Sequence, residues 1–176
     1  MNYTENMTSK DMVKEKNADL QKDVNIGLKK PDRKRVATGL SHLLADTYAL
    51  MIKTHNYHWN VTGPMFKQIH ELTEEQYNEM FEAIDEIAER IRALGFIAPG
   101  SLGAFSELTQ IRSGNSEWGA AEMIQDLVNS HETLVRTARG ITEAASYMDD
   151  EATADLLTNR LGVHEKYIWM LRSFLK

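Results

Sequence analysis

Apolar residues recur at every third or fourth position in four long stretches of the chain, which is the pattern of helices with one buried face. A shorter fifth helix is expected at 104–111, inside a connection over 96–115 that is rich in Gly and Ser. Four long helices with one long middle connection predict an all-α four-helix bundle. The long stretches are 31–60, 64–94, 116 to beyond 141, and 149–175.

Residues at the ends of these stretches favour the start or the end of a helix. Pro31 suits a first helical turn, and Gly63-Pro64 makes a short turn that leads into the second helix. Gly95 ends that helix, and Ser116 is the expected N-cap of the third. The tight turn at Gly63 should bring the end of the first helix close to the start of the second.

The N-terminal part differs in composition from the remainder of the chain. Residues 1–31 are polar and lack a helical stripe, which predicts a flexible polar tail (1–31) before a bundle domain (32–176). Residues 1–35 hold nine Lys/Arg against six Asp/Glu, a net charge of +3. A solvated extension explains this excess as well as a DNA-contacting arm does. The lysines of such an arm would be Lys10, Lys14, Lys16, Lys22, Lys29 and Lys30.

Overall composition excludes several classes of protein. The net charge of −6 argues against a surface that coats nucleic acid generally, and the absence of Cys excludes disulfides and thiolate metal sites. No apolar run has the length of a membrane span, and the stretch MNYTENMTSKDMVKEK lacks the apolar core of a signal peptide. We therefore expect a cytoplasmic protein without a membrane partner.

The second helix carries candidate metal ligands along the flank of its apolar stripe. At 100° per residue from His70, Glu74 falls at about 40°, Asp85 at about 60° and Glu89 at about 100°. His70 and Glu74 share one turn, whereas Asp85 and Glu89 share another that lies roughly 16 Å further along the helix. The stripe itself consists of Phe66, Ile69, Tyr77, Met80, Phe81, Ile84, Ile87 and Ile91.

One metal ion with ligand bonds near 2 Å cannot reach both pairs on a single straight helix. Either the pairs are unrelated, each then more typical of a solvated surface than of a site, or an antiparallel second copy brings one pair opposite the other across a two-fold axis. An intrachain di-iron site with Glu-x-x-His motifs is not expected, since no Glu is followed three residues later by His. Imidazole and carboxylate donors favour iron or manganese over a soft metal.

The candidate ligands belong to a longer pattern: His58-Trp59-Asn60-Val61 with Gly63 and Phe66, then His70-x3-Glu74, then Asp85-x3-Glu89-Arg90. This pattern resembles the signature of the Dps-type miniferritins (DNA-binding proteins from starved cells) of the ferritin-like superfamily. The resemblance covers about residues 31–176. It implies a hollow dodecamer built from two-fold dimers, in which intersubunit sites oxidise Fe²⁺, preferably with H₂O₂. Ferric mineral would be stored inside the shell, and this ferroxidase activity would protect DNA from oxidative damage.

The resemblance also implies residue roles at a site that holds two iron ions. One subunit would supply His58, His70 and Glu74, and its partner Asp85 and Glu89; many members of the family have Asp in place of this Glu74. Trp59 would accept oxidising equivalents beside the metal or anchor the dimer contact. His55 would hold a ligand in place or lie at the interface, whereas His42, His131 and His164 are expected to be structural or exposed.

The acidic cluster Asp149, Asp150, Glu151 and Asp155 has two interpretations. It is typical of a charged helix start, and the resemblance places cation pores near this junction, where three copies would attract Fe²⁺. Two other functions stay open. One is a DNA-binding, nucleoid-compacting particle with secondary iron chemistry, and the other is a purely structural helical oligomer.

Overall fold

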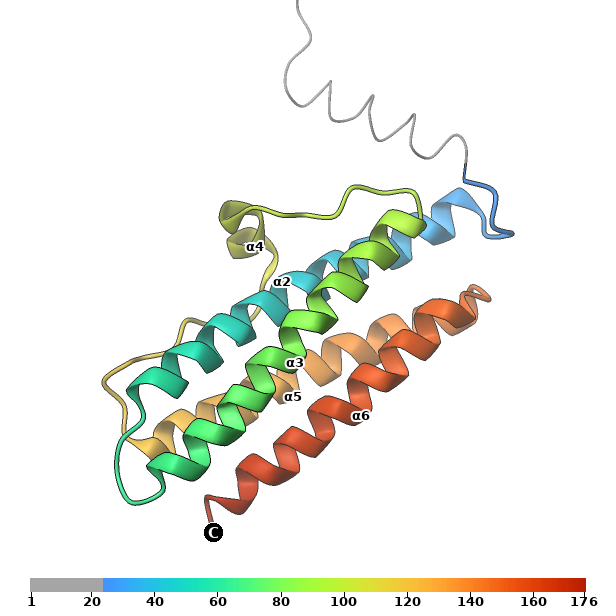
Figure 1. Cartoon of the computed structure of the whole chain (residues 1–176). Helices are drawn as coiled ribbons and strands as arrows, with labels where there is room; N and C mark the ends of the chain where they lie inside the picture. Colours follow the sequence, from blue (N-terminus) through green and yellow to red (C-terminus); the bar gives the residue numbers. More distant parts are fainter. Residues whose placement is uncertain (1–23) are drawn as a thin grey trace, which may run out of the picture.

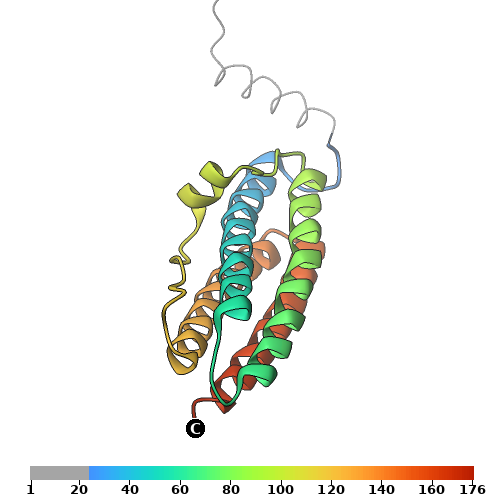
Figure 2. The ribbon, with the colours of Figure 1, turned by 60° about the vertical axis from the view of Figure 1, so that its left-hand side comes forward.

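Four long helices lie side by side in the computed structural model, which describes residues 24–176 (Figures 1 and 2). A short helix, α4, lies outside the bundle against α2. No strand occurs within residues 24–176, and no helix there is long and apolar enough to cross a bilayer. The predicted all-α four-helix bundle is confirmed. The helices are α2 (Lys30–Asn60), α3 (Phe66–Ala93), α4 (Leu102–Leu108), α5 (Ala120–Tyr147) and α6 (Glu151–Ser173).

The bundle consists of two helical hairpins joined by one long crossover. Helix α2 pairs with α3, α5 pairs with α6, and α2 also packs against α5. The segment between α3 and α5 runs along the outside of the bundle and includes α4 (Figure 1). Asp46 of α2 fixes this segment, because its buried Oδ1 accepts hydrogen bonds from the Thr109 hydroxyl at 2.8 Å and the Gln110 amide at 2.7 Å.

The predicted start of the third long helix was wrong by one turn. Gly119, not Ser116, is the N-cap of α5, and the Glu122 side chain accepts a hydrogen bond from the Gly119 amide at 2.9 Å. Ser116 donates its hydroxyl proton to Asn56 Oδ1 at 2.9 Å, so its oxygen is drawn towards α2 instead of capping a helix. This tertiary contact overrides the local capping preference.

The short helix was predicted two to three residues too late. It begins at Leu102 because the Ser101 hydroxyl accepts a hydrogen bond from the Ala104 amide at 3.2 Å. It ends at Leu108 because Thr109 is extended and bound to Asp46. A capping serine and a side-chain anchor thus set both ends.

The stripe predicted for the second helix is mostly buried. Phe66 and Phe81 are exceptions, with 43% and 68% of their surface exposed. Phe66 stacks on His70 with ring centroids 5.1 Å apart. Phe81 lies on the flank of α3 that carries the candidate carboxylates. Glu74, Asp85 and Glu89 on that flank are also exposed. The buried positions of α3 include Ile69, Met80, Ile84, Ile87 and Ile91.

Two histidines pair in the core, in agreement with the structural alternative predicted for them. His131 of α5 and His164 of α6 are completely buried, and their Nδ1 atoms lie 2.9 Å apart. Arg160 donates to His164 Nε2 at 3.2 Å and forms an ion pair with Glu79. Burial, reinforced by Arg160 and Lys53, lowers the pKa of His131 to about 3, and burial also holds the pKa of His164 well below its usual value. Both imidazoles are therefore neutral in the folded bundle.

Acidification should destabilise the bundle through this pair. The unfolded chain binds protons at these histidines near pH 6.5, whereas the folded chain does not. The free energy of unfolding is therefore highest, as far as this pair is concerned, above pH 6.5, and it falls as the pH drops towards about 3. The free energy of unfolding should fall by up to about 1.4 kcal/mol per pH unit for each histidine. Urea denaturation at fixed protein concentration measures this slope. His131→Gln should make it shallower, and an identical slope would contradict the assignment.

Candidate metal centre

The turn between α2 and α3 brings two candidate ligands into contact. His58 lies in the last turn of α2, and His70 lies near the start of α3. Gly63 has a φ of 107°, a conformation that favours glycine, which lets the chain reverse within a few residues. The two imidazole rings stack with centroids 3.7 Å apart and planes 17° apart.

Each of these histidines is hydrogen-bonded to the backbone of the other. His58 Nδ1 lies 2.8 Å from the His70 carbonyl oxygen, and His70 Nδ1 lies 2.9 Å from the His58 carbonyl oxygen. A carbonyl oxygen only accepts hydrogen bonds, so both Nδ1 atoms carry a proton, and in the neutral form of each ring Nε2 is the nitrogen with the free lone pair. Metal-binding histidines commonly have this arrangement, in which the second nitrogen fixes the tautomer and the ring.

The predicted carboxylates are divided along α3. Glu74 lies one turn beyond His70, with its Oε1 3.4 Å from the Tyr77 hydroxyl. Asp85 and Glu89 are exposed and lie further along the helix. Within residues 24–176 no group of three or more His, Asp or Glu side chains is placed to hold a metal ion. The described chain thus brings His58 and His70 together, with Glu74 nearby, and leaves Asp85 and Glu89 apart. We call His58, His70 and Glu74 the half-site.

Aromatic and imidazole rings lie against the half-site. His55 stacks on Trp59 with centroids 5.1 Å apart, and its centroid lies 3.8 Å from that of Tyr77. Trp59 is 69% exposed in the single chain. Sequence reasoning assigned Tyr77 only to the apolar stripe, although its position three residues after Glu74 placed it on the same helix face.

The acidic residues at the start of α6 differ in their surroundings. Asp150 is buried and caps α6: its carboxylate accepts from the Thr153 amide at 3.1 Å and pairs with Arg90 at 2.6 Å. Asp149, Glu151 and Asp155 are exposed. A groove of about 450 Å³ between α3 and α6 includes both Glu89 and Asp155. A pore-lining role stays a prediction, and Asp150 is the member whose charge is already neutralised by a partner.

The predicted DNA-contacting lysines fall mostly outside the described residues. Lys10, Lys14, Lys16 and Lys22 lie there, and so does most of the predicted tail. Lys29 and Lys30 are exposed at the start of α2. Their role and the tail boundary at residue 31 stay predictions.

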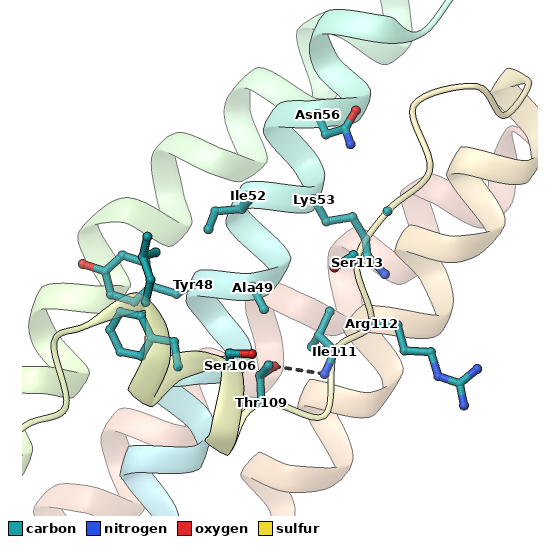
Figure 3. Close-up of a pocket in the computed structure, with 13 residues that line it drawn as sticks. Tyr48, Ala49, Ile52, Lys53, Asn56, Ser106, Thr109, Ile111, Arg112 and Ser113 are labelled. Atoms are coloured by element: carbon teal, nitrogen blue, oxygen red, sulfur yellow. Dashed lines mark hydrogen bonds between the residues drawn. The ribbon is translucent and has the colours of Figure 1, made fainter.

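A separate hollow of about 270 Å³ lies between α2, α4 and the segment after α4 (Figure 3). Tyr48 and Phe105 stack on one side of it with centroids 4.4 Å apart. On the other side the buried Lys53 ammonium pairs with Asp126 at 2.8 Å and donates to Ser130 at 2.8 Å. The hollow contains none of the predicted ligands.

Comparison with known proteins agrees with the fold. The model of the ferritin-like domain family matches residues 37–176, so the bundle is of the ferritin-like class. A low temperature-induced protein of Nostoc is 41% identical over 155 residues, 87% of each chain. A DNA protection during starvation protein of Brevibacillus brevis is 39% identical over 141 residues, 80% of this chain and 95% of the relative.

A solved structure supports the same assignment. The Dps protein of Vibrio cholerae O1, described as a member of a broad superfamily of ferritin-like diiron-carboxylate proteins, superimposes with a TM-score of 0.83 at 32% identity. The match covers 87% of this chain and 97% of that one. The chain therefore belongs to the Dps proteins of the ferritin-like family.

Asp150 should matter for stability more than its exposed neighbours do. Asp150→Asn should lower the free energy of unfolding by about 3 kcal/mol, because it leaves Arg90 partly buried without its ion-pair partner. Asp155→Asn, an exposed carboxylate of the same helix, should change it by less than about 0.5 kcal/mol. Urea denaturation of both variants tests this difference, and equal effects would show that the Arg90 pair contributes nothing.

Proposed function

We propose that this protein oxidises Fe²⁺ and stores the ferric product, using a metal site that two copies of the chain complete together. The observation that carries the proposal is the half-site itself. Two imidazoles are fixed with their Nε2 atoms free and one carboxylate, that of Glu74, lies nearby, yet Asp85 and Glu89 lie elsewhere on the chain. A two-fold axis would bring Asp85 and Glu89 of each chain to the half-site of the other chain. A dimer would then contain two complete sites.

The donor set fits iron as the substrate. His58, His70 and Glu74 of one subunit would face Asp85 and Glu89 of the partner subunit, and two iron ions would bind at each such site. Carboxylate oxygen stabilises Fe³⁺, and neutral imidazole keeps the total charge of the site low. Exposed Phe81, on the same flank of α3, would be covered by the partner subunit. The exposure of this flank in the single chain supports an interface there.

Hydrogen peroxide is the oxidant that suits two adjacent ferrous ions. Each Fe²⁺ supplies one electron, so peroxide is reduced by two electrons without release of a hydroxyl radical. Ferric mineral would collect inside a dodecamer of about 240 kDa, assembled from 20.1 kDa chains in the cytoplasm. Several relatives are DNA protection during starvation proteins, and removal of iron and peroxide would protect DNA here as well.

A mixing experiment tests whether the site is shared. Chain X carries His58→Ala and His70→Ala, and chain Y carries Asp85→Ala and Glu89→Ala, so neither alone forms a complete site. In an X–Y dimer one site receives His58 and His70 from Y with Asp85 and Glu89 from X, and is intact. Random co-assembly should restore about a quarter of the wild-type sites, because half of the dimers are mixed and each has one intact site.

The readout is the amplitude of fast ferric absorbance after anaerobic Fe²⁺ loading and addition of H₂O₂. Chains X and Y assembled separately should lack the fast phase, and light scattering confirms that all samples have the same size. His42→Gln is the matched control, since His42 lies on α2 and binds the Leu108 carbonyl away from the half-site. A mixture as inactive as its components would contradict a shared site, and fast activity of X alone would exclude His58 and His70.

DNA contact through the N-terminal lysines is a second proposed activity, favoured by the net charge of +3 on residues 1–35. Particles lacking residues 1–31 should bind DNA more weakly than the full chain, and the difference should shrink as salt rises, because counterion release drives such binding. Gel mobility shifts across a salt series measure this. Equal shifts for both proteins would assign any nucleoid association to another surface.

A further inference from the structure

A row of rings connects the half-site with Trp59. The Tyr77 ring lies edge-on to His58 with centroids 5.2 Å apart, and its centroid is 3.8 Å from that of His55. His55 in turn stacks on Trp59, with centroids 5.1 Å apart and planes only 10° apart. Tyr77 thus contacts a predicted metal ligand on one side and a stacked imidazole–indole pair on the other.

The hydroxyl of Tyr77 is directed to the remaining member of the half-site. Its oxygen lies 3.4 Å from Glu74 Oε1, which is one turn earlier on α3. Loss of an electron from a phenol is accompanied by loss of its proton, so a phenol donor needs a proton acceptor nearby. Tyr77 therefore has both partners that this reaction needs: a ring contact towards the metal ligands and a carboxylate at its hydroxyl.

We infer that Tyr77 is a one-electron donor to the iron site and that His55 connects it to Trp59. The inference rests on the proposed function. It applies when a site holds only one Fe²⁺, because that ion supplies only one of the two electrons that peroxide needs. Tyr77 supplies the second electron, so no hydroxyl radical leaves the site. An electron from Trp59 then passes through the stacked His55 ring to the oxidised Tyr77.

The step balances in atoms and charge. One Fe²⁺, one H₂O₂ and the phenol of Tyr77 yield one Fe³⁺, one hydroxide, one water and a neutral tyrosyl radical. The O–O bond of peroxide and the O–H bond of Tyr77 break. The phenolic proton passes to the Glu74 carboxylate and ends in the water. The Trp59 indole then gives up one electron and its N–H proton, and Tyr77 takes up one electron and one proton, which restores the phenol and leaves a neutral tryptophanyl radical.

Freeze-quench EPR tests the identity of the donor. Particles loaded with fewer Fe²⁺ ions than sites are mixed with H₂O₂, with ring-deuterated tyrosine marking any tyrosyl signal by its narrowed hyperfine splitting. Wild type should show this signal and Tyr77→Phe should lose it, while hydroxyl radical caught by a spin trap in solution should rise. Phenylalanine keeps the ring that packs on His55, so the substitution removes only the hydroxyl. Tyr147→Phe is the matched control, since Tyr147 is 86% exposed on α5 and lies outside the row.

Ferric absorbance recorded on the same samples separates the two ideas. If no Fe³⁺ forms in wild type, the proposed function fails and the inference fails with it. If Fe³⁺ forms but the tyrosyl signal is absent from wild type or survives in Tyr77→Phe, only the inference is overturned. Trp59→Phe should prolong the tyrosyl signal, and unchanged decay would overturn the path through His55.

Discussion

The two hydrogen bonds exchanged by His58 and His70 are the constraint on which the half-site depends. Each imidazole donates to the backbone of the other, so the bonds join the end of α2 to the start of α3 and fix the tautomers of both rings. A single change of tautomer would break one of these bonds and block a lone pair. The geometry of the α2–α3 hairpin and the chemistry of the site are therefore set by the same contacts.

The architecture follows from the sequence wherever one local signal dominates. Apolar periodicity over four long stretches is enough to predict the four helices, because burial of one helix face outweighs any single residue. Helix ends are less predictable when side chains have competing partners. Ser116 is a good N-cap by type, but it bonds to Asn56, so the cap moves to Gly119. That competition depends on a tertiary contact between α2 and the crossover, which local pattern does not contain.

The geometry of the candidate site is only partly predictable from the sequence. The turn at Gly63 and the spacing of the histidines are sufficient to predict that His58 approaches His70. The close approach of the Tyr77 ring to His55 is not, because it depends on how α2 and α3 rotate against each other. Asp85 and Glu89 are a different case, because their proposed role depends on a second copy of the chain. The single chain shows only that both side chains are exposed.

Division of the proposed pocket between chains has a consequence for timing in the cell. A newly synthesised polypeptide holds two imidazoles and a nearby carboxylate, but no cluster within its described part that would retain an ion. Redox turnover then rises with the square of protomer concentration until association is complete. Iron oxidation would thus be withheld until two chains have associated, which is also the first step in building the container for its product.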